Sequence, residues 1–196
     1  MLNNMRDSLS PALEKIGRGF AKTKLPATFW TIVGLVIALV SGIVYGFDVQ
    51  SSLLLGGVLL LVSGFFDIVD GQVARITKTT TKSGAFLDSI FDKIAEVVIF
   101  IGILVGQLAE PILVILALSL SLLVSYTRSR AESLGIMLQG VGIGERAERL
   151  LVIALVGIVG SIVGVMDVMN YAMIIICIIA GITFIQRIII SAKKLD

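Results

Sequence analysis

The chain has 196 residues, of which 57% are hydrophobic and 15% are charged, and its mean hydropathy is +1.03. This composition excludes a soluble domain and is typical of an integral membrane protein, and with a formal net charge of only +2 no nucleic-acid partner is expected. A single cysteine, Cys177, excludes an intrachain disulfide.

Residues 1–24 combine basic side chains with apolar residues at helical spacing, between Leu2 and Phe20. The basic residues are Arg6, Lys15, Arg18, Lys22 and Lys24. This pattern predicts an amphipathic helix that lies on an anionic membrane surface, and a basic tail without fixed structure is the alternative. No signal peptide is expected, because charges interrupt the apolar core that such a segment needs.

Five uncharged runs are long enough to cross a hydrocarbon core of about 30 Å. They are Leu25–Phe47, Val49–Phe66, Pro111–Thr127, Leu150–Met166 and Val168–Gln186. A further run, Val97–Ala109, crosses only if its helix extends back through Asp92 and Asp88 to about Gly84, which places both carboxylates at the membrane boundary or inside it. We therefore expect an all-α integral membrane protein with six transmembrane helices in one domain, 25–196, after a juxtamembrane segment, 1–24.

The basic residues are confined to one set of connections. Every Lys and Arg lies in the N-terminal segment or in the regions 75–93, 128–149 and 187–194. The other three turns hold Asp48, Glu110 and Asp167 and no basic residue. The positive-inside rule then predicts a multi-pass protein of the cell membrane, with both termini and the aspartate-rich loop on the cytoplasmic side.

Four aspartates stand close together in an otherwise apolar stretch. Asp67 and Asp70 are three residues apart, and Asp88 and Asp92 are four apart, so each pair lies on one face of a helix. Carboxylates gathered in this way need cations to neutralise them. Mg²⁺ or Mn²⁺ fits best, because the chain has no His and only one Cys. Paired membrane aspartates also occur in proton and cation transporters.

The aspartates belong to a longer pattern, D-x2-D-G-x2-A-R-x8-G-x3-D-x3-D. Its residues here are Asp67, Asp70, Gly71, Ala74, Arg75, Gly84, Asp88 and Asp92. On this motif the sequence resembles the CDP-alcohol phosphotransferase family. Members of that family transfer a phosphatidyl-type group from a CDP-linked lipid to an alcohol and release CMP.

The resemblance implies roles for these residues. Asp67, Asp70 and Asp88 would bind one divalent metal, Asp70, Asp88 and Asp92 would surround a second, and Asp92 would be the general base. The residues that would bind the CDP-lipid are Thr31, Gly34, Asp67, Asp70, Gly71, Ala74, Arg75, Thr81, Gly84 and Asp88. Small residues such as Gly71, Ala74 and Gly84 also serve close helix packing in membranes.

A second cluster consists of arginines at the cytoplasmic ends of the later helices. They are Arg128, Arg130, Arg146, Arg149 and Arg187. One explanation is that positive charge at these helix ends anchors the protein in the membrane and forms local salt bridges. Lys would serve that purpose equally well, whereas Arg is suited to bidentate binding of phosphate. An acceptor with its own phosphate would explain them.

The surrounding residues narrow the resemblance to one branch. They are Tyr126, Arg128, Arg130, Ala131, Glu132, Gly135, Glu145, Arg146, Glu148, Arg149, Gln186 and Arg187. The set looks like the phosphatidylinositol-phosphate and archaetidylinositol-phosphate synthase branch, whose acceptor is inositol 1-phosphate. It implies CDP-diacylglycerol or CDP-archaeol as donor, two Mg²⁺ or Mn²⁺ ions per active site, and a homodimer in membrane lipid. Glycerol 3-phosphate or another polar alcohol as acceptor, and more distantly cation transport, are the alternatives.

Overall fold

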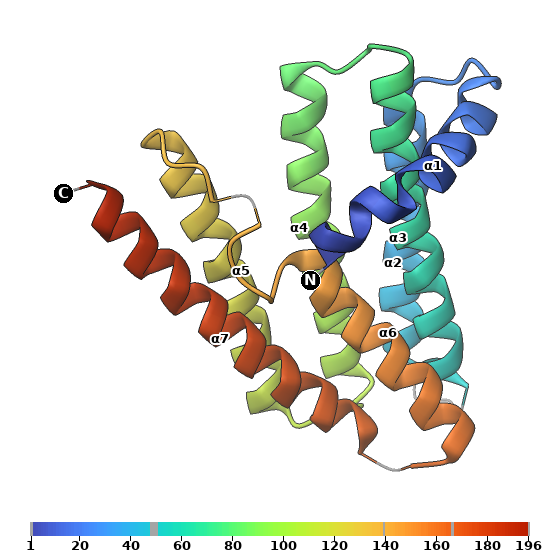
Figure 1. The fold of residues 1–196 in the computed structure, drawn as a ribbon. Helices are drawn as coiled ribbons and strands as arrows, with labels where there is room; N and C mark the ends of the chain where they lie inside the picture. The colour runs from blue at the N-terminus through green and yellow to red at the C-terminus, as the bar shows by residue number, and fades with distance from the viewer. Residues whose placement is uncertain (1, 48–50, 139, 166, 196) are drawn as a thin grey trace.

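Figure 1 shows the computed structural model of the chain, which is built from helices. The structure describes residues 2–47, 51–138, 140–165 and 167–195, and the exposure of side chains is described from residue 11 onward. Within these ranges there is no strand, and the helices are α1 (Leu2–Ala21), α2 (Ala27–Tyr45), α3 (Ser52–Ile76), α4 (Lys82–Val105), α5 (Pro111–Ser133), α6 (Arg146–Val163) and α7 (Val168–Leu195). The predicted all-α class is confirmed.

Four of the described helices, α2, α3, α5 and α7, are long and apolar enough to cross a membrane. Large apolar side chains such as Phe29, Ile112 and Ile162 are exposed on the outside of the bundle, as contact with lipid requires. The chain is therefore a multi-pass membrane protein. The helices α4 and α6 coincide with two expected spans, but charged residues extend as far as Glu96 in α4 and stand at the start of α6, so length and composition alone do not mark them as spans.

The helices extend beyond the uncharged runs at one end of the bundle. The helix α3 continues ten residues past Phe66, the last residue of the expected span, to Ile76, and α5 continues past Thr127 to Ser133. Charged site residues therefore lie on regular helix rather than in loops. Residues Asp48, Val49 and Met166, which mark expected turns and span ends, lie outside the described residues.

Small residues let the helices approach closely. A Cβ atom on Gly102 would collide with the backbone of Gly42, so α2 and α4 are in backbone contact. Ser63 donates a hydrogen bond of 2.9 Å to the carbonyl of Gly34 and thereby ties α3 to α2. A buried core that includes Tyr45 and Phe100 fills the remaining space between the helices.

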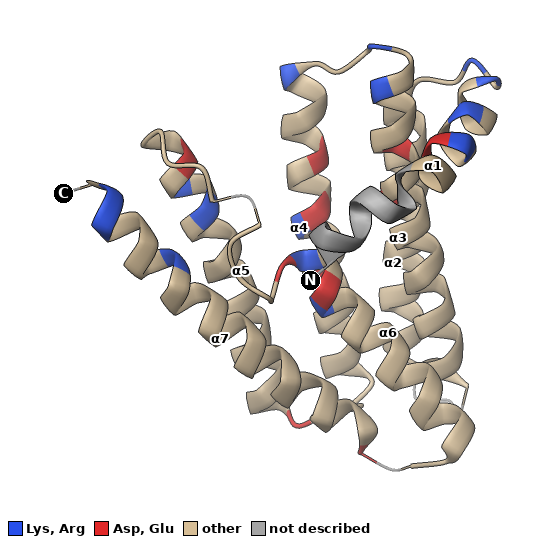
Figure 2. Ribbon diagram, viewed as in Figure 1, with Lys and Arg blue, Asp and Glu red and all other residues tan. Residues whose placement is uncertain are grey.

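The charged residues gather at one end of the molecule. Figure 2 shows that Lys and Arg positions lie near the α3–α4 and α5–α6 connections, whereas the α4–α5 and α6–α7 turns at the other end carry Glu110 and Asp167. The helix α1 crosses the bundle on the basic side (Figure 1), where Phe20 packs against Trp30 with ring centroids 4.8 Å apart. A Cβ on Gly17 would lie 2.6 Å from Cβ of Gln72, so α1 also sits directly on α3.

Candidate active site

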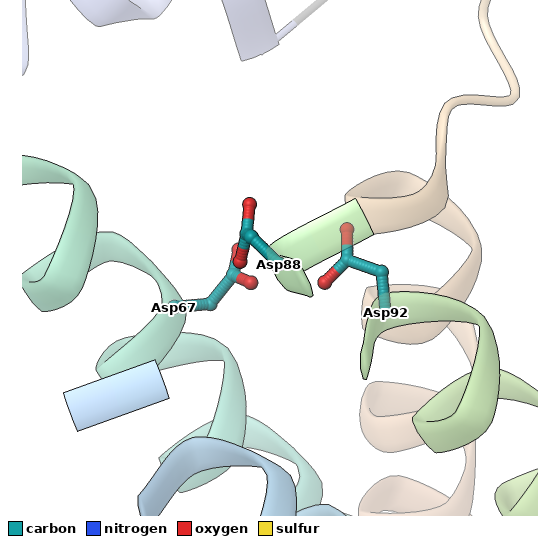
Figure 3. Close-up of side chains that lie close together, drawn as sticks. All are labelled: Asp67, Asp88 and Asp92. Atoms are coloured by element: carbon teal, nitrogen blue, oxygen red, sulfur yellow. The ribbon is translucent and has the colours of Figure 1, made fainter. Parts of the chain in front are cut away.

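The aspartates converge where the end of α3 faces the start of α4. Figure 3 shows the carboxylates of Asp67, Asp88 and Asp92 directed toward one another. One oxygen from each lies within 4.8 Å of the others. The two pairs predicted from helical spacing are thus brought together, and three of the four carboxylates form one possible ligand set.

The fourth aspartate, Asp70, is buried beside this set. Its side chain is 7% exposed, and among the described residues its Oδ2 atom has no hydrogen-bond partner. A buried carboxylate oxygen without a partner is costly unless a cation or a donor satisfies it. Hard oxygen donors are the ligands that Mg²⁺ and Mn²⁺ prefer, so the four aspartates fit a divalent metal.

A first cavity, here called the small-residue cavity, lies between α2, α3 and α4 and has a volume of about 620 Å³. Its lining includes Thr28 and, of the predicted CDP-lipid residues, Thr31, Asp70, Gly71, Ala74, Thr81, Gly84 and Asp88. A Cβ on Gly71 would meet nothing within 4 Å, so this glycine is not needed for helix packing. Thr81 caps α4, because its hydroxyl accepts a hydrogen bond of 3.0 Å from the Gly84 amide.

Three of the predicted CDP-lipid residues lie elsewhere. Gly34 and Asp67 line a narrower cleft of about 260 Å³ next to the small-residue cavity. A Cβ on Gly34 would be 3.3 Å from Cβ of Phe66, so this glycine serves close helix packing as well. Arg75 is exposed and is not part of the lining of these cavities.

A second cavity, here called the arginine cavity, has a volume of about 860 Å³ and opens on the other side of the aspartates. Four helices contribute to it. Its charged lining residues are Asp88, Asp92, Lys93, Arg128, Glu132, Glu145, Arg146, Arg149 and Arg187. Four of the five predicted arginines are therefore brought together. Arg130 is exposed, contacts Ser133 at 3.5 Å, and does not line the cavity.

Arg146 connects the predicted arginines to the predicted aspartates. Its Nη1 atom lies 3.1 Å from Asp67 Oδ1 and 2.5 Å from Asp92 Oδ1. The guanidinium therefore neutralises part of the aspartate charge. A capping box formed by Glu145 and Glu148 starts α6 at this point and fixes the position of the arginine.

Two other arginines of the cavity are buried and form hydrogen bonds with other groups of the protein. Arg149 is 0% exposed, donates from Nε (3.0 Å) and Nη2 (2.5 Å) to Glu96 Oε1, and donates from Nη1 to the Gly144 carbonyl. Arg187 is 2% exposed and donates to the carbonyls of Val124 and Val141. These side chains hold α4, α5, α6 and α7 together at the wall of the cavity.

The sequence analysis missed Lys93 and Glu96. Glu96 continues the spacing of Asp88 and Asp92 by one more turn of α4, and this repeat is the signal that identifies it. Lys93 follows Asp92 directly, lines the arginine cavity, and places Nζ 3.3 Å from Glu96 Oε2. Since Glu96 is buried, its charge is balanced by Lys93 and Arg149.

The aspartates stand between the two cavities. Asp70 and Asp88 line the small-residue cavity, whereas Asp88 and Asp92 line the arginine cavity. Asp67, Asp70, Asp88 and Asp92 would hold a metal, which would supply positive charge to neutralise a bound phosphate. This arrangement suits transfer of a group from a molecule bound in one cavity to a molecule bound in the other.

The sequence matches known proteins over most or all of its length. Residues 24–185 match the family model of CDP-alcohol phosphatidyltransferases. The chain is 34% identical to the archaetidylinositol phosphate synthase of Pyrococcus horikoshii, over 100% of this chain and 99% of that protein. It is 38% identical to the archaetidylinositol phosphate synthase of Methanothermobacter thermautotrophicus, over 100% of this chain and 96% of that protein.

Solved structures of one protein share the fold. The phosphatidylinositol phosphate synthase of Mycobacterium tuberculosis, crystallised with CDP-DAG bound, superposes with a TM-score of 0.77 at 26% identity, covering 90% of this chain and 91% of that one. Its complex with manganese and citrate gives a TM-score of 0.79 at 26% identity, covering 91% and 88%.

Proposed function

Because this chain belongs to the CDP-alcohol phosphatidyltransferase family, we propose that it transfers the phosphatidyl or archaetidyl group of a CDP-linked lipid to inositol 1-phosphate and releases CMP. The observation that carries this proposal is the position of the aspartates between a cavity lined by small and hydroxyl residues and a cavity lined by arginines. The relatives named archaetidylinositol phosphate synthase, aligned over the full chain, support the choice of acceptor.

The small-residue cavity is the proposed site of the CDP group. Gly71 and Gly84 let a nucleotide approach the backbone, and the hydroxyls of Thr31 and Thr81 supply hydrogen-bonding groups. Gly34 and Asp67 border it through the adjoining cleft. Arg75 belongs to the same sequence motif as residues that line this cavity. It would contact the phosphates of the CDP-lipid from outside the cavity. The acyl or isoprenoid tails of the donor would enter from the bilayer, past the exposed apolar faces of α3 and α4.

The arginine cavity is the proposed site of the acceptor. A phosphorylated alcohol carries about two negative charges at neutral pH, and the basic side chains of this cavity come from four helices. Arg128 and Arg146 are partly exposed and can contact the phosphate, whereas Arg149 and Arg187 shape the wall and add positive potential. Arg130, which lies outside the cavity, would act on phosphate only at its entrance.

Asp92 is the proposed general base. It lines the arginine cavity, so an acceptor hydroxyl bound there reaches its carboxylate, which accepts the proton as the oxygen attacks phosphorus. Asp67, Asp70, Asp88 and Asp92 would hold two divalent ions. When bound, such ions neutralise the diphosphate and stabilise the charge on departing CMP. Arg146 keeps Asp92 oriented toward Asp67.

The proposal includes the membrane arrangement. We propose that α4 and α6 also span the bilayer, which gives six spans within a domain of residues 25–196. The charged end shown in Figure 2 would face the cytoplasm, with both termini, and α1 would lie on the membrane surface beside it. A homodimer is proposed from the family resemblance alone.

The test is CMP release by the purified protein with Mg²⁺ or Mn²⁺ and either CDP-diacylglycerol or CDP-archaeol. Acceptors are added one at a time: inositol 1-phosphate, inositol, and glycerol 3-phosphate. CMP that depends on inositol 1-phosphate supports the whole proposal. CMP with glycerol 3-phosphate instead keeps the aspartate chemistry and overturns the acceptor, and cation flux without CMP release would replace the enzyme with a transporter.

A further inference from the structure

Fewer basic side chains of the arginine cavity are available to contact a ligand than the number of its arginines suggests. Arg149 and Arg187 are buried, and their guanidinium groups donate to Glu96, Gly144, Val124 and Val141. A side chain held in this way can add to the electric field but has little freedom to approach a ligand. The groups with exposed surface are therefore the ones to examine for direct contact with the acceptor.

Three basic side chains in the cavity have such exposed surface. Arg128 is 40% exposed, Lys93 is 32% exposed, and Arg146 is 19% exposed. Arg146 contacts Asp67 and Asp92, and is thus directed at the proposed metal site. Lys93 and Arg128 remain as the partly exposed cations of the cavity whose ion-pair partners, Glu96 and Glu132, lie outside the aspartate cluster.

Lys93 has the better position of these two relative to the reacting groups. It is adjacent in sequence to Asp92, and it lines the cavity together with Asp88, Ser89 and Asp92 from the same helix. Its Nζ atom contacts Glu96 Oε2 at 3.3 Å. An ammonium group has three donors, so one bond to Glu96 leaves two for a ligand.

Glu96 explains why Lys93 is held at this point. The carboxylate is buried, and its other oxygen, Oε1, is bonded to Arg149. It is therefore fixed in position by α6 and serves as an anchor for the lysine. The Lys93 side chain remains 32% exposed while it makes this contact, and it lines the cavity.

We infer that Lys93 binds the phosphate of the acceptor and helps to select a phosphorylated alcohol, with Glu96 as its positioning residue. The inference rests on the proposed function, because it assigns a contact within the acceptor site. Lys93 reaches the phosphate from α4, the helix that also carries Asp92. It therefore sets the distance between the acceptor's phosphate and the hydroxyl that Asp92 deprotonates.

The experiment compares Lys93→Met and Lys93→Arg with Lys82→Met, a control at the exposed start of the same helix. CMP release is measured at saturating CDP-lipid with inositol 1-phosphate and inositol as acceptors. Lys93→Met should raise KM for inositol 1-phosphate about tenfold or more, the loss expected for one charge-assisted hydrogen bond. It should leave KM for CDP-lipid unchanged and reduce the preference for the phosphorylated acceptor.

The conservative variant and the control make the result specific. Lys93→Arg should recover most of the affinity because it restores charge and donors, and Lys82→Met should match the wild type. An unchanged KM in Lys93→Met, or a loss confined to kcat, overturns the inference. Failure of the proposed function looks different, because the wild type would then release no CMP with inositol 1-phosphate. If the wild type uses another phosphorylated alcohol, the same KM comparison with that acceptor decides the role of Lys93.

Discussion

The two cavities on either side of the aspartates are built in different ways. The small-residue cavity takes most of its lining from one continuous segment, residues 70–91, and the aspartates are its only charged groups. The arginine cavity collects charged side chains from α4, α5, α6 and α7. The first cavity is suited to admit a ligand close to the backbone, and the second is suited to bind and orient an anion.

This difference indicates where each part of the chemistry is encoded. In the proposed function, recognition of the nucleotide and of the metal would depend on a local motif that folds as two helix ends and a short turn. Recognition of the acceptor would depend on a cavity whose walls are fixed by ion pairs between distant helices, such as Arg149 with Glu96. Substitutions of the aspartates should therefore abolish catalysis, those of the small residues should weaken CDP-lipid binding, and those of the buried ion pairs should alter stability and acceptor use.

The largest effect is expected at the junction of the two cavities. Asp92→Asn keeps the shape of the side chain but removes the proposed proton acceptor, so CMP release should fall about 10²–10⁴-fold. CDP-lipid binding, measured by equilibrium titration with a labelled donor, should be largely retained because Asp92 does not line the small-residue cavity. Substantial residual turnover would remove Asp92 from the role of general base.

The next largest effect is a loss of stability that distinguishes the buried Arg149 from the exposed Arg130. Arg149→Ala leaves the Glu96 carboxylate buried with only Lys93 as partner, which should lower the free energy of unfolding by about 3–5 kcal/mol. Arg130→Ala, at an exposed position outside the cavity, should change it by less than about 0.5 kcal/mol. Thermal unfolding in detergent measures both.

Acceptor kinetics complete this test. In the Arg149→Ala protein that remains folded, use of the phosphorylated acceptor should weaken more than binding of the CDP-lipid. The same result is expected for Arg187→Ala. The double substitution Glu96→Gln with Arg149→Gln should recover part of the lost stability, because it removes both buried charges. Equal destabilisation by Arg130→Ala and Arg149→Ala would contradict the division between wall and surface arginines.

A smaller effect is expected in the small-residue cavity. Gly71 and Gly64 both lie on α3 with open space beyond their Cα atoms, but only Gly71 faces the cavity. Gly71→Leu should weaken CDP-lipid binding by about 5- to 150-fold, equivalent to an overpacking cost of about 1–3 kcal/mol. Gly64→Leu should leave binding unchanged. Equal losses of affinity in both variants would show that the glycines act through the helix rather than through the cavity.

The sequence predicted one side of the site much better than the other. The spacings of Asp67, Asp70, Asp88 and Asp92 are local, so helix periodicity alone places each pair on one face. The convergence of two pairs then requires only a short connection, which here is residues 77–81.

The arginine side depends on contacts that no local pattern encodes. Arg149 and Glu96 are 53 residues apart, and Arg187 and Val124 are 63 apart, so their burial follows from helix packing. The sequence identified Arg130 by its type, but the turn of α5 on which it sits directs it away from the cavity. Composition likewise identifies α2, α3, α5 and α7 as candidate spans, whereas α4 and α6 carry charged residues and are not identified in this way.

The smallest expected effect concerns the contact between α1 and α3 next to the small-residue cavity. A Cβ on Gly17 would lie 2.6 Å from Cβ of Gln72, which directly follows Gly71, and no side-chain rotation moves either atom. Gly19 on the same helix has nothing within 4 Å. Alanine should stabilise the helix at Gly19 by about 0.5–1 kcal/mol, whereas at Gly17 the collision should exceed this gain.

Protease digestion distinguishes the two variants. Gly17→Ala should loosen α1 from α3 and expose the connection at residues 22–26 to cleavage, with a modest rise in KM for the CDP-lipid. Gly19→Ala should be cleaved as slowly as the wild type, or more slowly. If both variants resist cleavage equally and keep the same KM, α1 is bound mainly by the membrane, and the contact of Gly17 with Gln72 does not support the cavity.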